Sequence, residues 1–278
     1  MNFEYTSLAI TKWKLDDFMD VVDNFENDFA DAVHHKEYVS QEYKTILLHI
    51  VGKSLVTIRE ILTLCAQGYS DGALSLGRNL YEQMIIVLFF ELHKNDNEFQ
   101  KYVEDFFLSY EVQRNKCFRD IDQYVPSGDM DKLNIELEEL KNRANRKIKG
   151  DYWWAGCNSF SDLVNHVMRN QTDGLLYQFF GVHYMRYKRA CIALHASCMG
   201  NSVRIGSKAG FHVVDTSPSV YGQSTPLGYA TISLIAIVGV VCDMFQIDHV
   251  KHTKPLNELA AFYLEKEETD SKSNSERE

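Results

Sequence analysis

An arginine and a glutamate four residues apart are the first side chains in this sequence whose types and spacing could do chemistry. Arg78 and Glu82 occur in the segment SLGRNLYEQM, which is otherwise largely uncharged, and residues at positions i and i+4 share one face of a helix. A buried ion costs free energy unless it is paired and hydrogen-bonded. The two side chains therefore either neutralise each other as an internal ion pair that fixes helix packing, or they serve a site.

A second polar stripe lies more than a hundred residues later. Tyr187, Cys191 and His195 recur every four residues in YKRACIALHAS, and Ser197 follows, so a helix would carry them on one face. Imidazole titrates near neutrality, which makes His195 a candidate general acid or base. Two alternatives stay open. His195 is a hydrogen-bonded core residue, or Cys191 and His195 form a nucleophilic pair, although a helical cysteine more often only packs.

Signatures of common cofactor and metal sites are missing from the sequence. It contains no glycine-rich phosphate loop, no H-E-x-x-H motif and no E-x-x-H motif. Asp31 with His34, and His249 with His252, each place two ligands about one turn apart. A structural metal site needs about four ligands and a catalytic site about three. We therefore expect no cofactor and no bound metal.

Helices must position these candidate side chains, because apolar residues recur at helical spacing over most of the chain. The runs are 13–35, 38–66, 72–93, 96–121, 173–199 and 226–247. Four prolines and fifteen glycines are few for an all-β protein. The second half of 72–93, MIIVLFF, is apolar on every side, and Gly68 can end the preceding helix in a left-handed conformation. The pattern predicts an all-α protein, a single multi-helix bundle with 72–93 as its central helix.

Three segments differ from this pattern. Residues 130–150 are rich in glutamate and then basic, which predicts a protruding, solvated helix. Residues 201–225 contain three glycines, five serines and one proline, which predicts a long, lid-like loop with a weak β-ribbon near 211–214. Residues 265–278 have almost nothing to bury, which predicts an acidic, disordered tail. Without a repeat or a convincing linker, residues 1–264 are expected to form one helical domain.

Charge and hydropathy limit the partners. The chain has 29 Lys and Arg against 39 Asp and Glu, a net charge of −10, which opposes a broad phosphate-binding face. We therefore expect no DNA binding. The first residues lack the pattern of a secretory signal, and the six cysteines contain no C-x-x-C pair, so we expect a cytoplasmic protein with reduced thiols. The uncharged run 226–242 is shorter than the roughly 20 residues of a membrane span. A buried core helix is favoured there over a membrane segment.

The two polar segments resemble a family of uncharacterised, all-helical bacterial proteins grouped as a domain of unknown function. The family pattern is R-x-x-x-E on an early apolar helix and Y-x-x-x-S-x-x-x-H-(G/A)-S on a late one. Arg78, Glu82, Tyr187 and His195 match it, with Ala196 and Ser197 after the histidine, whereas Cys191 stands where the family usually has serine. This departure weakens any role for a hydroxyl group at that position. The resemblance covers roughly residues 46–247.

The family is in turn similar to HEPN domains, helical bundles whose ribonuclease members use an R-x(4 to 6)-H motif. Arg189 and His195 meet that spacing. Six positions along a straight helix nevertheless place two side chains about 120° apart. Arg189 would therefore need a distorted turn to share a site with His195.

These resemblances imply a metal-independent ribonuclease, of the kind that acts as a toxin or phage-defence effector. His195 would be the general acid or base, Arg78 the cation that stabilises a phosphorane-like transition state, Glu82 the residue that orients Arg78, and Tyr187 an auxiliary hydrogen-bond donor. RNA is then the expected partner. The alternative is a non-catalytic helical module that binds a small ligand, a partner protein or a second copy of the chain, with the same residues as a structural network. The net charge of −10 favours the module, and the polar stripe favours the enzyme.

Overall fold

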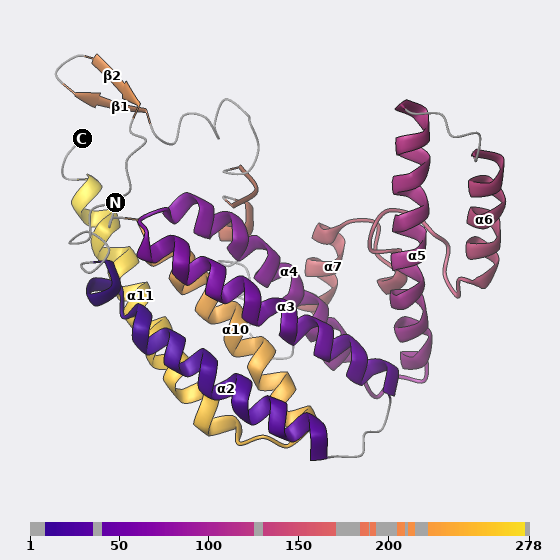
Figure 1. Cartoon of the computed structure of the whole chain (residues 1–278), viewed down its shortest axis with the longest axis horizontal. Coiled ribbons are helices and arrows are strands. Elements are labelled where there is room, and N and C mark those ends of the chain that lie inside the picture. The colour runs from indigo at the N-terminus through magenta and orange to yellow at the C-terminus, as the bar shows by residue number, and fades with distance from the viewer. Residues whose placement is uncertain are drawn as a thin grey trace. The chain divides into compact units, whose positions relative to one another are not determined.

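The protein is all-helical apart from one short β-ribbon, as the sequence predicts. A computed structural model of the chain describes residues 9–35, 41–124, 130–170, 184–188, 190–192, 205–208, 211–214 and 222–275. The helices are α2 (Leu15–His35), α3 (Gln41–Ala66), α4 (Ser70–His93), α5 (Phe99–Tyr124), α6 (Met130–Arg143), α7 (Phe160–Arg169), α10 (Ser224–Phe245) and α11 (His249–Ser275), with the 3₁₀ turn η1 at Trp153–Ala155 (Figure 1). Residues 184–188 and 190–192 are also helical.

The chain divides into two compact units, although the sequence suggests one domain. The first unit comprises Met1–Val87 with Gln178–Glu278, and the second comprises Leu88–Tyr177. The first boundary falls inside the continuous helix α4 (Ser70–His93). No linker composition marks such a boundary, because the residues on both sides of it are apolar and helical. The expectation of a single domain rested on the lack of a linker.

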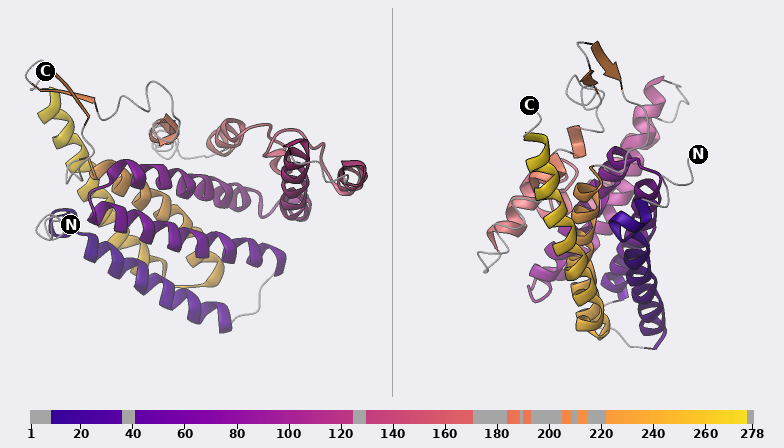
Figure 2. Two further views of the ribbon diagram at one scale, coloured as in Figure 1. Left: turned by 45° about the horizontal axis from the view of Figure 1, so that its top comes forward. Right: turned by 90° about the vertical axis from the view of Figure 1, so that its left-hand side faces the viewer.

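Helix α10 forms the centre of the first unit. It contacts α2, α3 and α11, and α2 also contacts α3 and α11; these helices run side by side in both views of Figure 2. At 22 residues, α10 is long and apolar enough to cross a membrane, but 72% of its most apolar window is buried inside the structure. The length argument made from the sequence therefore does not hold. Burial against three neighbouring helices is what favours a core helix.

The central helix α4 is confirmed. Its apolar residues from Leu80 to Phe90 include seven with no exposed surface, namely Leu80, Tyr81, Met84, Ile85, Val87, Phe89 and Phe90. The predicted end of the preceding helix, α3, at Gly68 is confirmed as well. Gly68 has φ of +82°, and the amide of Tyr69 donates to the Leu64 carbonyl at 2.8 Å, which closes the end of α3 as a left-handed glycine does. Gly77 then lets α4 approach α10, because a Cβ there would lie 2.9 Å from Cδ1 of Tyr229.

Aromatic packing builds the second unit. The Trp154 ring of η1 stacks on Phe90, with centroids 5.5 Å apart, and meets Phe106 of α5 edge-on at 4.8 Å. Helix α7 begins with a capping box, in which the side chains of Ser159 and Asp162 each accept a hydrogen bond from the backbone amide of the other residue. This motif fixes where the helix starts. Gly150 has φ of +74°, and a Cβ there would lie 1.8 Å from the Asn158 carbonyl oxygen. Only glycine fits this turn.

The helix expected within residues 130–150 is present but shorter, and most of its residues are exposed. Helix α6 ends at Arg143, and it packs against α5 with Leu140 buried. Its polar side chains find partners on α5: Arg143 forms a bidentate ion pair with Glu111 at 2.9 and 3.3 Å, and the Asn115 amide donates to the Leu133 carbonyl at 3.0 Å. The surface of acidic and then basic residues is solvated, as the sequence predicts, and part of it also pairs with the neighbouring helix.

The C-terminal segment and the 201–225 segment also differ from the expectation. Helix α11 continues to Ser275, where the sequence predicts disorder from residue 265. Glu267 explains the start of this extension, because it pairs with Arg186 and accepts a bond from Thr225 Oγ1 at 3.0 Å. In place of an unbroken loop, strands β1 (Ile205–Lys208) and β2 (Phe211–Val214) form an antiparallel ribbon, as the β-propensity near 211–214 suggests. The remaining parts of 201–221 lie outside the described residues.

Candidate functional site

Arg78 and Glu82 form the predicted pair on α4. The Nε atom of Arg78 donates to Oε1 of Glu82 at 2.9 Å, and the two side chains are 32% and 22% exposed. The pair is therefore in contact with solvent and is not sealed in the core. An ion pair of this exposure stabilises a fold by little, so stability alone gives a weak reason for the two charges to be there.

Tyr187 joins this pair from a segment 105 residues further along the chain. Its hydroxyl group donates to the same Oε1 atom of Glu82 at 3.0 Å, and its ring lies 5.9 Å from the guanidinium carbon of Arg78. The Tyr187 ring packs against Tyr81, with centroids 5.5 Å apart, and Tyr81 stacks on Tyr229 of α10 at the same separation. This aromatic stack holds the buried Tyr187 side chain against α4.

The surroundings keep Arg78 charged and Tyr187 protonated. The hydrogen bond from Glu82 raises the pKa of Arg78, because it favours the guanidinium form. Burial raises the pKa of Tyr187, and the negative charge of Glu82 and the hydrogen bond to it raise it further. Near neutral pH the site therefore contains a permanent cation, a carboxylate that orients it, and a neutral phenol that donates to the same carboxylate. Together they form the Arg78 cluster, defined as Arg78, Glu82 and Tyr187.

Arg78 retains unused donor capacity. A guanidinium group carries five N–H donors in a planar fork, and within the described residues Arg78 makes a hydrogen bond only through Nε. Its two terminal amino groups therefore face no protein acceptor in that part of the chain. An oxyanion such as a phosphate matches the geometry of these two groups. The cluster can bind an anion without breaking the bond between Arg78 and Glu82.

The remaining residues of the predicted site divide into one that is described and others that are not. Cys191 is half-buried and lies close enough to raise the pKa of both Arg78 and Tyr187. His195, Ala196 and Ser197 lie outside the described residues, as does Arg189. The convergence of Arg78 with His195 therefore stays a prediction. The convergence of Arg78, Glu82 and Tyr187 is what the structure shows.

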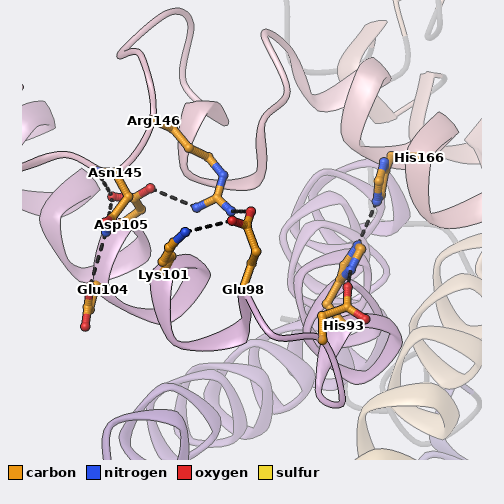
Figure 3. A network of polar contacts seen from close by, with 9 residues as sticks. His93, Glu98, Lys101, Glu104, Asp105, Asn145, Arg146 and His166 are labelled. Carbon is orange, nitrogen blue, oxygen red and sulfur yellow. Dashed lines mark hydrogen bonds and ion pairs between the residues drawn. The ribbon is translucent and has the colours of Figure 1, made fainter.

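A second polar network lies in the other unit and was not found from the sequence (Figure 3). Asp105 on α5 has no exposed side-chain surface, and its carboxylate accepts from Arg146 Nη1 at 3.0 Å and from the Asn145 backbone amide at 2.9 Å. The Arg146 guanidinium also lies 3.8 Å from the ring centroid of Tyr102 and 3.4 Å from Glu98. Asp105 is one of several charged residues on α5, and nothing in its spacing distinguishes it from the others. Its partners lie about forty residues further along the chain.

Two histidines and an aspartate form a hydrogen-bonded series in the same unit. Asp96 Oδ2 accepts from Nδ1 of His93 at 2.5 Å, and Nε2 of His93 lies 2.8 Å from Nε2 of His166 on α7, as Figure 3 shows for the two histidines. The rings are stacked, with centroids 5.1 Å apart. Burial, and then the charge of His93, lower the pKa of His166 from 6.5. The spacing of His93 and Asp96 was a detectable signal, whereas the contact with His166 depends on tertiary structure.

The histidine pairs noted in the sequence have other partners. His252 is buried, and its Nε2 atom lies 2.9 Å from Oδ2 of Asp28, while Nδ1 of His249 lies 3.4 Å from the hydroxyl of Thr253. Within the ranges that the structure describes, no three His, Cys, Asp or Glu side chains are grouped so that they could hold a metal ion.

Comparison with known proteins identifies a family. The profile of a family of unknown function, DUF5677, matches residues 44–212, a range that contains Arg78, Glu82, Tyr187 and His195. No curated protein and no solved structure matches the chain. The resemblance to an uncharacterised, all-helical family is confirmed, and the relationship to HEPN domains stays a prediction.

Proposed function

Because the chain belongs to DUF5677, a family of unknown function, its activity has to be inferred from its own residues, and we propose that it is a metal-independent ribonuclease of the HEPN kind. The proposed site comprises the Arg78 cluster together with His195. The resemblance that suggests HEPN chemistry also suggests a cytoplasmic toxin or phage-defence effector that acts on RNA. Each of these points is a proposal, and the geometry of the Arg78 cluster is the observation that supports it best.

The unused donors of Arg78 are the single observation that supports this proposal best. A structural ion pair would be expected to use both terminal amino groups or to be sealed from solvent. Arg78 instead is 32% exposed and is held through Nε alone. Glu82 thus fixes the plane of the guanidinium and leaves its outer edge for a ligand. This is the arrangement that stabilises charge developing on a phosphate in a transition state.

The proposed chemistry follows from the groups available. His195 removes the proton from a ribose 2′-hydroxyl group, and the 2′-oxygen attacks the adjacent phosphorus. The bond between phosphorus and the 5′-oxygen breaks, and that oxygen takes up a proton from water, after which His195 returns its own proton to the solvent. The products are a 2′,3′-cyclic phosphate and a free 5′-hydroxyl group. Arg78 stabilises the negative charge on the phosphorane-like transition state, and Tyr187 holds Glu82 in place. DNA lacks the 2′-hydroxyl group and would not be cleaved.

The experiment is RNA cleavage in a buffer that contains a chelator. Wild-type protein should cleave single-stranded RNA or a structured RNA such as tRNA, and the products should carry a 2′,3′-cyclic phosphate. His195→Ala should lower the rate by at least about 10²-fold, the scale of general acid–base catalysis. Arg78→Ala should lower it by a similar factor, because the transition-state charge loses its donors.

The matched control is Arg143→Gln, which removes an exposed arginine from an ion pair on α6 and should leave cleavage unchanged. Circular dichroism of each variant has to show an intact helical fold. RNA cleavage that is absent at micromolar protein, or that is indifferent to His195→Ala, contradicts the proposal.

The second candidate function is a non-catalytic module that binds a small ligand, a partner protein or a second copy of the chain. The net charge of −10 favours it, since it repels polyanions. The Arg78 cluster is also electrically paired through Glu82 without any ligand. A module of this kind predicts that Arg78→Ala lowers stability or ligand affinity while no RNA is cleaved by the wild-type protein.

A further inference from the structure

A polar pocket of about 330 Å³ runs along α7 in the second unit. Its lining comes from the turn before α7 and from one face of the helix: Gly156, Cys157, Asn158, Asp162, Asn165, His166, Arg169 and Asn170. A volume of this order suits a small molecule. The lining includes no residue of the Arg78 cluster.

Two groups in this pocket can bind an anion. Arg169 is exposed and forms no ion pair or hydrogen bond within the described residues, so its guanidinium fork is available. His166 is half-buried at the pocket wall, and the only hydrogen bond of its imidazole ring within the described ranges joins Nε2 to His93. The carboxylate of Asp162 is the one negative charge in the lining, and it is occupied by the backbone amide of Ser159 at 3.1 Å.

The direction of the hydrogen bonds at His93 decides what His166 can do. Asp96 accepts from Nδ1 of His93, which places the proton on that nitrogen and leaves Nε2 of a neutral His93 as an acceptor. Nε2 of His166 must then donate to it across the 2.8 Å contact. Nδ1 of His166 has no proton while that ring is neutral. When His166 is protonated, Nδ1 becomes a donor, and every bond in the chain is still satisfied.

The charged groups around His166 determine when it takes up that proton. Asp96 in the turn after α4 and Asp162 on α7 favour a positive charge on His166, and Arg169 on α7 opposes it. His93 opposes it only when its own ring is charged. Tyr102 of α5 contributes a ring against His93, with centroids 5.0 Å apart. Burial is the main cause that lowers the pKa of His166. An anion bound beside Nδ1 would reverse this balance, because a nearby negative charge favours imidazolium.

We propose that this α7 pocket binds a small soluble molecule through a phosphate, sulfate or carboxylate group, held between Arg169 and protonated His166. The chain of Asp96 and His93 orients His166 so that it donates to the ligand. Asn158 and Asn165 supply neutral donors and acceptors for the rest of the molecule, and Asn170, whose amide nitrogen donates to the His166 carbonyl, supplies its amide oxygen. Binding therefore takes up one proton on His166 and strengthens as the pH falls.

Sulfate is a suitable probe because it keeps its charge across the neutral pH range. Any pH dependence of its binding must therefore come from protonation of the protein and not of the ligand. Sulfate is titrated into the full chain, and the imidazole signals of the histidines are followed by NMR, with His166→Gln identifying the His166 signal. Sulfate should raise the pKa of His166, and its affinity should be higher near pH 6 than near pH 8. Acetate should bind more weakly, because it has one charge fewer.

The variants separate this pocket from other cation sites. Arg169→Gln should weaken sulfate binding, read at the His166 signal, about tenfold or more, the scale of a lost charge-assisted hydrogen bond, while Arg143→Gln should leave it unchanged. His166→Gln should abolish the pH dependence. An unchanged His166 signal, equal affinity in Arg169→Gln, or a pH dependence that survives in His166→Gln would each overturn the proposal. The ribonuclease proposal is tested by RNA cleavage in His195→Ala and Arg78→Ala, so the two proposals stand or fail independently.

Discussion

Replacing Asp105 with asparagine tests whether the buried network of the second unit stabilises that unit. The Asp105 side chain has no exposed surface, and it accepts from Asn145 N at 2.9 Å, from Asn145 Nδ2 at 3.3 Å and from Arg146 Nη1 at 3.0 Å. Asparagine keeps an oxygen for the backbone amide of Asn145. It removes the negative charge and turns either an amide nitrogen or a weaker acceptor toward Arg146.

The expected loss of stability follows from what remains around Arg146. Removing one partner of a buried ion pair costs about 3–5 kcal/mol, because the other charge stays desolvated. Arg146 is 16% exposed, keeps Glu98 at 3.4 Å and lies 3.8 Å from the Tyr102 ring centroid, and these contacts offset part of the cost. We therefore expect Asp105→Asn to lower the free energy of unfolding of the second unit by about 3 kcal/mol.

Amide hydrogen exchange measures this loss for each unit separately. A loss of about 3 kcal/mol accelerates exchange of the core amides of α5 and α7 by about 100-fold, while amides of α10 serve as an internal reference. Lys101→Gln is the matched control: its ion pair with Glu98 has side-chain exposures of 51% and 56%, so removing it should cost no more than about 1 kcal/mol. Exchange in Asp105→Asn that differs from wild type by no more than about twofold refutes the reasoning.

Two further predictions concern charged groups that are only partly buried. Glu82→Gln should lower the free energy of unfolding by about 1 kcal/mol in urea titration, because Arg78 and Glu82 are 32% and 22% exposed; a loss of about 3 kcal/mol or more would show that Arg78 is desolvated. The folded pKa of His166 lies below its unfolded value of 6.5, so the unfolded chain binds more protons, and the stability of the second unit should fall as the pH drops below about 6.5. His166→Gln should flatten that pH dependence in hydrogen exchange, and an unchanged slope would assign it to another group.

The helical fold could be predicted because it depends on local patterns. The three- and four-residue spacing of apolar side chains predicts α2, α3, α4 and α10, the all-round apolar run MIIVLFF identifies α4 as central, and Gly68 marks the end of α3. These signals lie within a few residues of the structure that they cause. The pair Arg78 and Glu82 on one helix and the polar stripe from Tyr187 to His195 also indicate the uncharacterised family whose profile matches residues 44–212.

Segments whose structure depends on distant partners were predicted poorly. The acidic run after residue 265 looks disordered because it has nothing to bury, yet Glu267 pairs with Arg186 and α11 continues to Ser275. The basic end of α6 is solvated, as the sequence predicts, but its ion pair between Arg143 and Glu111 of α5 could not be read from the sequence. The composition of a segment describes only its own residues and not the partners that other segments provide. The partners of such segments come from elsewhere in the chain.

The sequence by itself determined the helices, the family and the pairing of Arg78 with Glu82, because residues four apart on a helix must be neighbours. Tertiary structure alone decided that Tyr187 donates to Glu82, that Asp105 is buried beneath Arg146, and that His93 meets His166. Contacts between residues forty to more than a hundred positions apart depend on how whole helices pack, and helix packing is set by the summed fit of many apolar side chains. No single spacing in the sequence records that sum.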